Sequence, residues 1–289
     1  MQIANPIYDV VFKYLMEDND IAKLLISTII GEEIVELAFL PQETTVSLEA
    51  HSLTVYRLDF SATIKKPDGS YRHVIIEIQK AKLATDIMRF RRYLGDQYQK
   101  KDNAYFETVR GKQIRKAMPI VSIYFIGYQL DKITAPVIKV NRNYYDVTTG
   151  EEILEREDFI ESLTHDSYVI QIPHLKSDHR TDIEELLRIF DQNQVTSDSH
   201  ILSIDEANYP EKYRLVIRHL QRALVEPHVK RTMDAEDDIL AELQDLEREI
   251  ERKDKALKDS YRIIEDKDKA LEDSYRIIEE LRKRLQTKD

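Results

Sequence analysis

The chain of 289 residues contains no cysteine. Disulfides and thiolate metal sites are therefore excluded, and a reducing compartment is consistent with this composition. Long apolar runs are also absent, because the longest, around Ile120 to Tyr128, is far too short to cross a bilayer. The first residues carry no basic segment followed by an apolar one, as a signal peptide would. We therefore expect a cytoplasmic, soluble protein of one or two domains with no membrane partner.

Several motifs that carry chemistry in other proteins are missing as well. The sequence has no glycine-rich phosphate loop, no nucleophile elbow, no zinc-ligand spacing and no motif that reads a DNA sequence. The histidines are scattered and receive no role here. The candidate chemistry therefore depends on carboxylates.

Charge is distributed unevenly along the chain. The net charge of −11 argues against nucleic-acid binding over the whole surface. Residues 80–116, however, carry eleven Lys and Arg side chains against four Asp and Glu, whereas the chain from Asp234 onward is acidic. Such a basic segment suits a phosphodiester substrate. The alternative is an ordinary solvated helix face.

The segment Val55 to Lys80 predicts a β-hairpin. Two runs of alternating apolar and polar residues flank the turn sequence Pro67-Asp68-Gly69. The alternation places Asp59 on the polar face of the first strand and Glu77 with Gln79 on that of the second. Adjacent strands lie about 5 Å apart, so the two carboxylates can converge on one cation. The alternative is that they are solvent-facing positions of an antiparallel hairpin.

Periodicity predicts the remaining elements of an α/β fold. Helical spacing covers Ile7 to Ile30, with an interruption near Asp18 and a stop at Gly31. A strand at Thr44 to Glu49, the hairpin, a helix at Leu83 to Lys101 and a buried strand at Met118 to Gly127 follow. Further strands are expected in the V-I-K-V-N-R and Y-V-I-Q-I-P segments. Helices are expected at 157–163, 181–192 and 210–225, with a polar linker at 193–203.

The C-terminal segment contains a near-identical tandem repeat. D-K-A-L-K-D-S-Y-R-I-I-E at 254–265 is followed by D-K-A-L-E-D-S-Y-R-I-I-E at 268–279, a period of two heptads. Apolar residues from Ile239 to Leu285 fit a coiled-coil seam with polar residues at alternate seam positions. We expect a homo-oligomer formed through this tail. The alternatives are a single charged helix or a helix docked on the body.

The positions of Asp59, Glu77 and Gln79, with the order helix, three strands, helix and strand, resemble the PD-(D/E)XK nuclease superfamily. More narrowly, N-P-I-Y-D-V-V-F-K-Y-L, I-I-E-I-Q-K and D-I-M-R-F-R-R-Y-L-G are similar to segments of the Rpn-type recombination-promoting nuclease and transposase family. The resemblance covers about Asn5 to Leu175 and continues to Gln192. It implies a restriction-endonuclease-like α/β core at 1–192, followed by a linker and helix at 193–233 and the coiled-coil tail at 234–289.

The resemblance also implies Mg²⁺-dependent cleavage of DNA, with Mn²⁺ as a substitute, in recombination or DNA mobility. Asp59, Glu77 and the main-chain carbonyl of Ile78 would bind the metal, and Gln79 stands where the superfamily usually has a lysine. Lysine supplies a positive charge, whereas glutamine can only orient a water. Arg89 and Arg92, which share a helix face, and Lys80, if the strand ends there, would contact the DNA backbone.

Two functions remain in competition at this point. The first is a metal-dependent DNA endonuclease, with RNA as an alternative substrate. The second is a non-catalytic protein of the same fold, which binds or scaffolds partners and is assembled by its coiled coil. Gln79 and the acidic net charge favour the second, whereas the intact Asp59 and Glu77 beside a basic segment favour the first.

Overall fold

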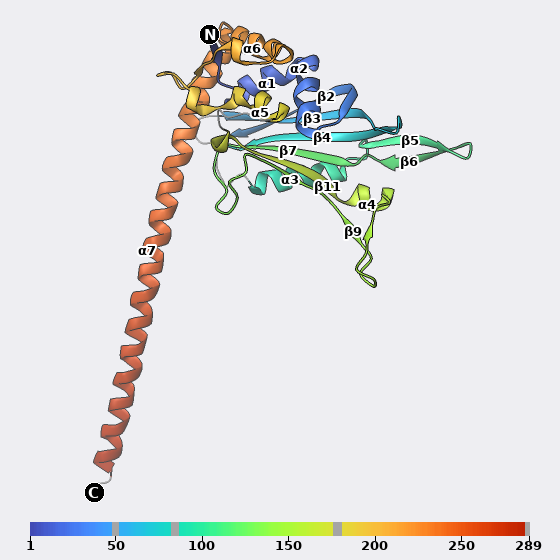
Figure 1. Cartoon of the computed structure of the whole chain (residues 1–289). Helices are drawn as coiled ribbons and strands as arrows, with labels where there is room; N and C mark the ends of the chain where they lie inside the picture. Colours follow the sequence, from blue (N-terminus) through green and yellow to red (C-terminus); the bar gives the residue numbers. More distant parts are fainter. Residues whose placement is uncertain (48–51, 82–86, 176–180, 287–289) are drawn as a thin grey trace. The chain divides into compact units, whose positions relative to one another are not determined.

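The computed structural model describes residues 1–47, 52–81, 87–175 and 181–286. The chain divides into two units, Met1–Glu236 and Asp237–Asp289. The first unit is a mixed α/β fold built on a six-stranded sheet (Figure 1), which confirms the α/β part of the predicted fold class. None of the helices in the described ranges is long and apolar enough to span a membrane.

The central sheet combines antiparallel and parallel strands. β3 pairs antiparallel with β2 and β4, β7 is parallel to both β4 and β11, and β8 is antiparallel to β11. β4 and β7 therefore lie in the middle of the sheet, where both of their faces are covered and a strand reads as a nearly continuous apolar run. In spatial order the strands are β2 (Glu33–Ser47), β3 (Ser52–Lys65), β4 (Tyr71–Ala81), β7 (Ile120–Ile126), β11 (His165–Gln171) and β8 (Val137–Val140).

The predicted hairpin turn is confirmed between β3 and β4. Gly69 has a φ of +82°, in the left-handed region that glycine adopts without strain. The amide of Lys66 donates to the carbonyl of Ser70 at 2.8 Å, and the Asp68 carboxylate accepts from the Ser70 amide at 2.9 Å. The turn chemistry thus sets the register in which the two strands meet.

Two short helices follow the first strand of the chain, as the interrupted periodicity predicted. α1 (Asp9–Glu17) and α2 (Asn19–Ile30) are separated at Asp18, whose carboxylate accepts from the amides of Asp20 and Ile21 and so caps α2. α2 ends at Gly31, which has a φ of +71°.

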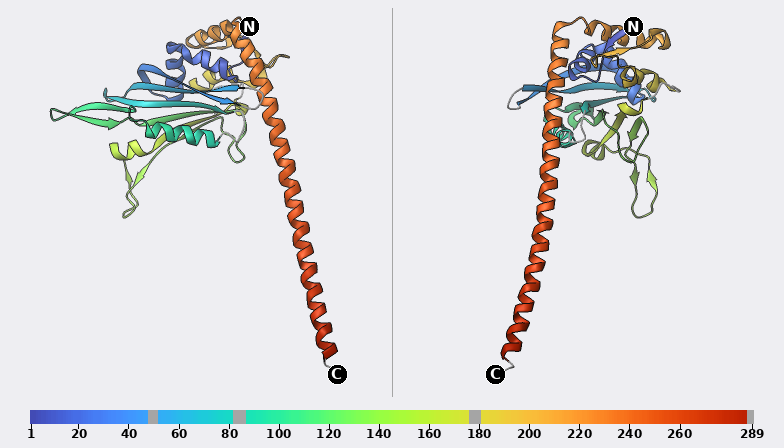
Figure 2. Two further views of the ribbon diagram at one scale, coloured as in Figure 1. Left: turned by 180° about the vertical axis from the view of Figure 1, so that it is seen from behind. Right: turned by 90° about the vertical axis from the view of Figure 1, so that its left-hand side faces the viewer.

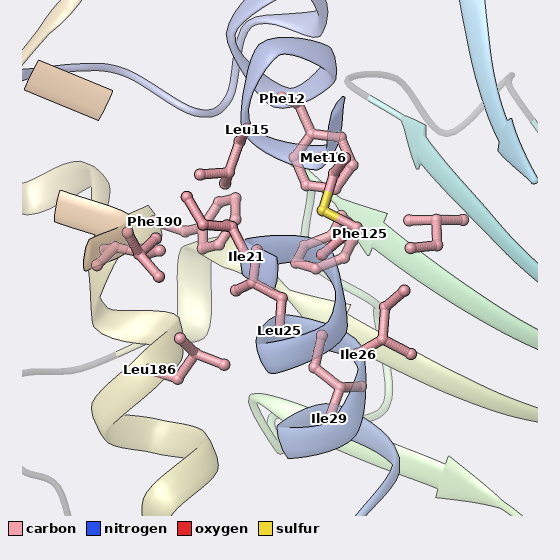
Figure 3. Packing of buried hydrophobic residues seen from close by; sticks show 14 of the residues in the cluster. Phe12, Leu15, Met16, Ile21, Leu25, Ile26, Ile29, Phe125, Leu186 and Phe190 are labelled. Atoms are coloured by element: carbon pink, nitrogen blue, oxygen red, sulfur yellow. The ribbon is translucent and has the colours of Figure 1, made fainter. Parts of the chain in front are cut away.

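The apolar core lies between these helices and one face of the sheet. Phe12 of α1 contacts Phe125 of β7, which in turn contacts Phe190 after α5 (Asp182–Leu187), with ring centroids 5.1 Å apart in both pairs. Figure 3 shows α2 inserting its apolar side among them. Each fully buried side chain of this size contributes about 1.5–3 kcal/mol to folding. The core residues labelled in that view are Phe12, Leu15, Met16, Ile21, Leu25, Ile26, Ile29, Phe125, Leu186 and Phe190.

The opposite face of the sheet carries different elements (Figures 1 and 2). α3 (Ile87–Gln99) lies there and falls within the predicted helix, of which residues 83–86 lie outside the described ranges. A two-stranded ribbon, β5 (Ala104–Val109) with β6 (Lys112–Ala117), follows α3 and extends beyond the sheet. The sequence analysis missed this ribbon. α4 (Asp158–Leu163) and the small pair β9 (Tyr144–Tyr145) and β10 (Glu152–Ile153) lie on the same side.

Residues 193–233, which we expected to form a linker and a helix, belong to the first unit. β12 (Ile201–Ser203) pairs antiparallel with β1 (Gln2–Ala4), and α6 (Glu211–Ala223) packs against β1 and α1. α6 does match the helix predicted at 210–225. Residues near 201–203 pair with the first strand of the chain. The polar composition of the segment gives no sign of this long-range pairing. The α6 residues Tyr213, Val216, Ile217 and Leu220 are fully buried.

The first turns of α7 (Pro227–Gln286) also belong to the first unit. Val229 and Met233 are buried in its core. The Glu236 carboxylate accepts from the amides of Asp9 at 2.8 Å and Val10 at 2.9 Å, at the N-terminus of α1. The N-cap residue of α1 makes no side-chain capping bond, so Glu236 satisfies amides that the helix itself leaves open.

The second unit consists of the rest of α7. It contains both copies of the 14-residue repeat, and Ser260 and Ser274, at equivalent positions, donate to the carbonyls four residues earlier. From Leu246 onward its described apolar side chains are exposed within the chain, at 44% for Leu246 and 54% for both Leu257 and Leu271.

Candidate active site

Three polar side chains form a row across the middle of the sheet. Asp59 on β3 is the register partner of Glu77 on β4, and Glu77 is the partner of Ser122 on β7. Register partners project from the same face, so the three side chains lie next to one another. Gln79, two positions along β4, is on this face as well. The fold therefore brings together the Asp59, Glu77 and Gln79 that the sequence singled out.

These groups are buried. Asp59 is 1% exposed, Glu77 is fully buried and Gln79 is 3% exposed. The alternative that they are solvent-facing positions of a hairpin is therefore wrong. The hairpin is not half-exposed, because β7 continues the sheet beyond β4 and α3 lies over this face.

Each carboxylate has a polar neighbour within the site. The Gln79 amide Nε2 donates to Glu77 Oε1 at 2.6 Å. Lys100, just after α3, places its Nζ 3.7 Å from Asp59 Oδ2. Burying a carboxylate costs several kcal/mol unless charge and hydrogen bonds compensate, so a chain would not place two here for packing alone.

Aromatic hydroxyls surround the pair. Burial raises the pKa of Tyr124, the neighbouring Ser122 hydroxyl opposes this, and the charge of Glu77 raises the pKa further. Burial also raises the pKa of Tyr98 on α3; the charge of Arg142 lowers it, whereas that of Glu77 raises it. Both tyrosines thus stay neutral over the physiological range and surround Glu77 with uncharged groups.

A histidine lies at the margin of this group. The ring Nδ1 of His165 is 3.0 Å from the Tyr98 hydroxyl. Burial and the charge of Arg142 lower the pKa of His165, although Asp166 opposes the shift. The sequence analysis assigned no role to His165, and its contact with α3 arises only in the folded chain.

Lys80 is not part of this group. β4 continues through Ala81, so Lys80 projects from the opposite face, where its Nζ lies 2.7 Å from Asp9 Oδ1. It also donates to the carbonyl of Ile7, and its side chain is 5% exposed. The expectation that Lys80 contacts DNA beside the carboxylates is therefore wrong, because the alternation of the strand directs it into the α1 side of the sheet.

Ile78 and the two arginines occupy different settings. The Ile78 side chain is buried on the core face, and Ile78 with Leu58 forms the last register pair between β3 and β4 among the described residues. Its carbonyl thus lies where these two strands separate. Arg92 is exposed on α3. Arg89 lies on α3, but its side chain is outside the part of the chain that the structure describes.

A basic surface that the sequence did not place adjoins the site. A cavity of about 270 Å³ lies beside α3 and is lined by Lys100, Lys101 and Arg115, together with Asn103 and Tyr98. Arg115 belongs to the ribbon β5–β6, whose tip carries exposed Arg110 and Lys112. The excess of basic residues in 80–116 predicted a positive surface. The fold of the ribbon then places Arg115 beside Lys100 and Lys101 around one cavity.

The oxygen atoms of the site suit a hard divalent cation. Gln79 Oε1 is buried and accepts no hydrogen bond from the described residues, and the amide of the same side chain is bonded to Glu77 Oε1. Mg²⁺ is commonly held by one or two carboxylates with water completing its shell. The described ranges contain no cluster of three or more His, Cys, Asp or Glu side chains that could hold a metal.

Comparison with known proteins identifies no relative. No family model, curated protein or solved structure matches this chain. The argument for function therefore comes from the residues of the site.

Proposed function

We propose that this protein is a metal-dependent nuclease that hydrolyses phosphodiester bonds in DNA, with a restriction-endonuclease-like core. The observation that carries this proposal is the burial of Asp59 and Glu77 as register partners on adjacent central strands. An apolar pair there would be more stable, since buried charges cost free energy. A functional role explains why two carboxylates are buried side by side, whereas packing alone does not explain it.

The roles of the residues follow from their positions. Asp59, Glu77 and the Ile78 carbonyl would hold Mg²⁺ or Mn²⁺, which supplies charge neutralisation at the phosphate and acidifies a bound water. Gln79 donates to Glu77 Oε1 and thereby orients that carboxylate. The low exposure of the pair excludes bulk water, which strengthens every electrostatic interaction with a phosphate.

The surrounding cations are suited to a nucleic-acid backbone. Lys101, Arg110, Lys112 and Arg115 are exposed on the turn after α3 and on the ribbon. Arg92 adds charge on α3 itself. Lys116 is different, because its ion pairs with Glu107 and Asp158 already use its charge. Contacts from these exposed cations would position a strand without reading its sequence.

Cleavage of supercoiled plasmid in Mg²⁺ or Mn²⁺ tests the proposal. We expect nicking or linearisation by wild type that EDTA abolishes and that Asp59→Asn and Glu77→Gln each reduce by at least about a hundredfold. Asp131→Asn, an exposed acid outside the site, is the matched control and retains full activity. A parallel assay with single-stranded RNA shows whether the protein distinguishes DNA from RNA. Wild type that leaves both substrates intact would contradict the proposal, as would activity that survives both substitutions.

A non-catalytic scaffold is the second candidate, and a specific observation favours it. Lys100 beside Asp59 and Gln79 on Glu77 already neutralise and bind the carboxylates with the chain's own groups. The exposed apolar residues of α7 would then provide the main function, assembly of copies through a coiled coil. Retained oligomerisation together with absent metal binding would favour this candidate over the nuclease.

A further inference from the structure

Lys100 joins the buried carboxylates to the adjoining cavity. Its side chain is 30% exposed, whereas that of its partner Asp59 is 1% exposed. The same lysine lines the cavity of about 270 Å³ beside α3. The ammonium group therefore lies at the boundary between the buried site and the space from which a substrate would approach.

The main chain around Lys100 is well anchored. Its amide donates to the carbonyl of Asp96 at 3.1 Å, which closes the last turn of α3, and its carbonyl accepts from the amide of Asn103 at 3.2 Å. The Asn103 side chain donates to Gln97 Oε1 at 2.7 Å and to the Gln97 carbonyl at 2.9 Å. Gln97 is itself 2% exposed. These bonds hold the end of the helix, and thus the base of the lysine side chain, over the carboxylate pair.

The strand that carries Glu77 does not supply a positive charge on this face. Gln79 is neutral, and its amide is engaged with Glu77. Lys80, the next residue, is paired with Asp9 on the other face of the sheet. A cation for the reacting phosphate must therefore come from another element, and Lys100 forms a salt bridge with Asp59.

The cavity beyond Lys100 has the chemistry of a phosphate site. Lys101 and Arg115 line it together with Lys100, and Arg115 is held in place because it donates to the carbonyl of Lys101. Three cations around one small space attract an anion and bind it more strongly where water is partly excluded.

We propose that Lys100, carried by the end of α3, provides at the phosphodiester the positive charge that Gln79 lacks. This proposal rests on the proposed nuclease function. In hydrolysis, the oxygen of water bonds to phosphorus, the bond from phosphorus to a sugar oxygen breaks with its electron pair on that oxygen, and the sugar oxygen takes up the proton that the water loses. Lys100 stays protonated throughout and neutralises charge on the non-bridging phosphate oxygens.

Metal binding provides a readout that is separate from activity. A divalent cation at Asp59 and the Lys100 ammonium would share one carboxylate and repel each other. Lys100→Gln should therefore bind Mn²⁺ more tightly than wild type, by at least about threefold in calorimetry without DNA. A lysine that merely held Asp59 in place would give the opposite result, weaker binding.

The experiment compares full-length wild type with Lys100→Gln, Lys100→Arg and the double variant Gln79→Lys/Lys100→Gln. We expect Lys100→Gln to reduce plasmid cleavage about a hundredfold. Lys100→Arg should retain part of the rate, and the double variant should recover at least about tenfold because the strand now supplies the charge. Lys66→Gln, an exposed lysine near the β3–β4 turn, is the matched control and cleaves normally. Unchanged thermal unfolding of Lys100→Gln shows that it is folded, and the double variant tests the charge independently if it is not.

The outcomes separate the two proposals. Wild type that cleaves while Lys100→Gln cleaves equally well would overturn the role of Lys100 and leave the nuclease standing. Loss of cleavage together with weaker Mn²⁺ binding, or failure of the double variant to recover, would also overturn it. Absence of cleavage by wild type would refute the nuclease function and, with it, this role.

Discussion

Lys80 and Asp9 form an ion pair, Nζ to Oδ1 at 2.7 Å, on the face of β4 opposite to Glu77. Gln79 of the candidate site and Lys80, the next residue, therefore project from opposite faces of β4, and Lys80 joins the strand to helix α1. The Phe12 ring lies 5.8 Å from the same ammonium. This lysine has a structural environment, although a strand ending at Lys80 would have let it reach the polar face.

We expect Lys80→Met to destabilise the fold while leaving nucleic-acid binding unchanged. Removing Lys80 takes one charge partner away from Asp9, at a cost of about 1–3 kcal/mol, toward the lower end because Asp9 is 23% exposed. Urea denaturation measures the loss, with Lys66→Met as the exposed control. A stable variant that binds DNA more weakly would reverse this assignment.

Metal should stabilise the protein through the carboxylate pair. At a Mg²⁺ concentration ten times its Kd, binding to the folded state alone adds about 1.4 kcal/mol to the free energy of unfolding. We expect thermal unfolding to shift upward with Mg²⁺, to return with EDTA, and to be insensitive to Mg²⁺ in Asp59→Asn. A shift that persists in this variant would place the metal elsewhere.

The tail should assemble copies of the chain. Leu257 and Leu271 occupy equivalent positions of the two repeats and are each 54% exposed within one chain. Replacing both by Asp should convert an oligomer into a monomer in sedimentation velocity, because charge is not tolerated in a coiled-coil seam. Lys258→Glu is the control, since the second repeat already has Glu272 there. A wild type that sediments as a monomer would contradict the expectation.

Stability should depend on pH through His165. Burial lowers its pKa in the folded chain, so the unfolded chain, with a histidine pKa of about 6.5, binds the proton more readily. Stability is therefore complete above pH 6.5 and falls as the pH drops from there toward the lower folded pKa. We expect His165→Gln to lose less stability than wild type between pH 7 and 5 in urea titrations. His228→Gln, at an exposed position, should keep the wild-type slope.

Local sequence was sufficient for much of the fold and for part of the site. The turn at Pro67-Asp68-Gly69 and the period-two alternation predicted β3, β4 and the shared face of Glu77 and Gln79. The break at Asp18 and the stop at Gly31 were readable because capping chemistry is local. The ribbon β5–β6 was not predicted, because its strands are short and mostly exposed and show no clear apolar period.

By itself, the sequence determined which strand positions share a face, where α2 begins and ends, where the β3–β4 turn lies, and that no thiol chemistry is available. Tertiary structure alone decided that the polar face of β4 is buried, because burial depends on β7 and α3 rather than on the hairpin. It also decided that Lys100 lies at Asp59 and Lys80 at Asp9. Charge pairs between distant residues depend on packing, and no spacing along the chain encodes them.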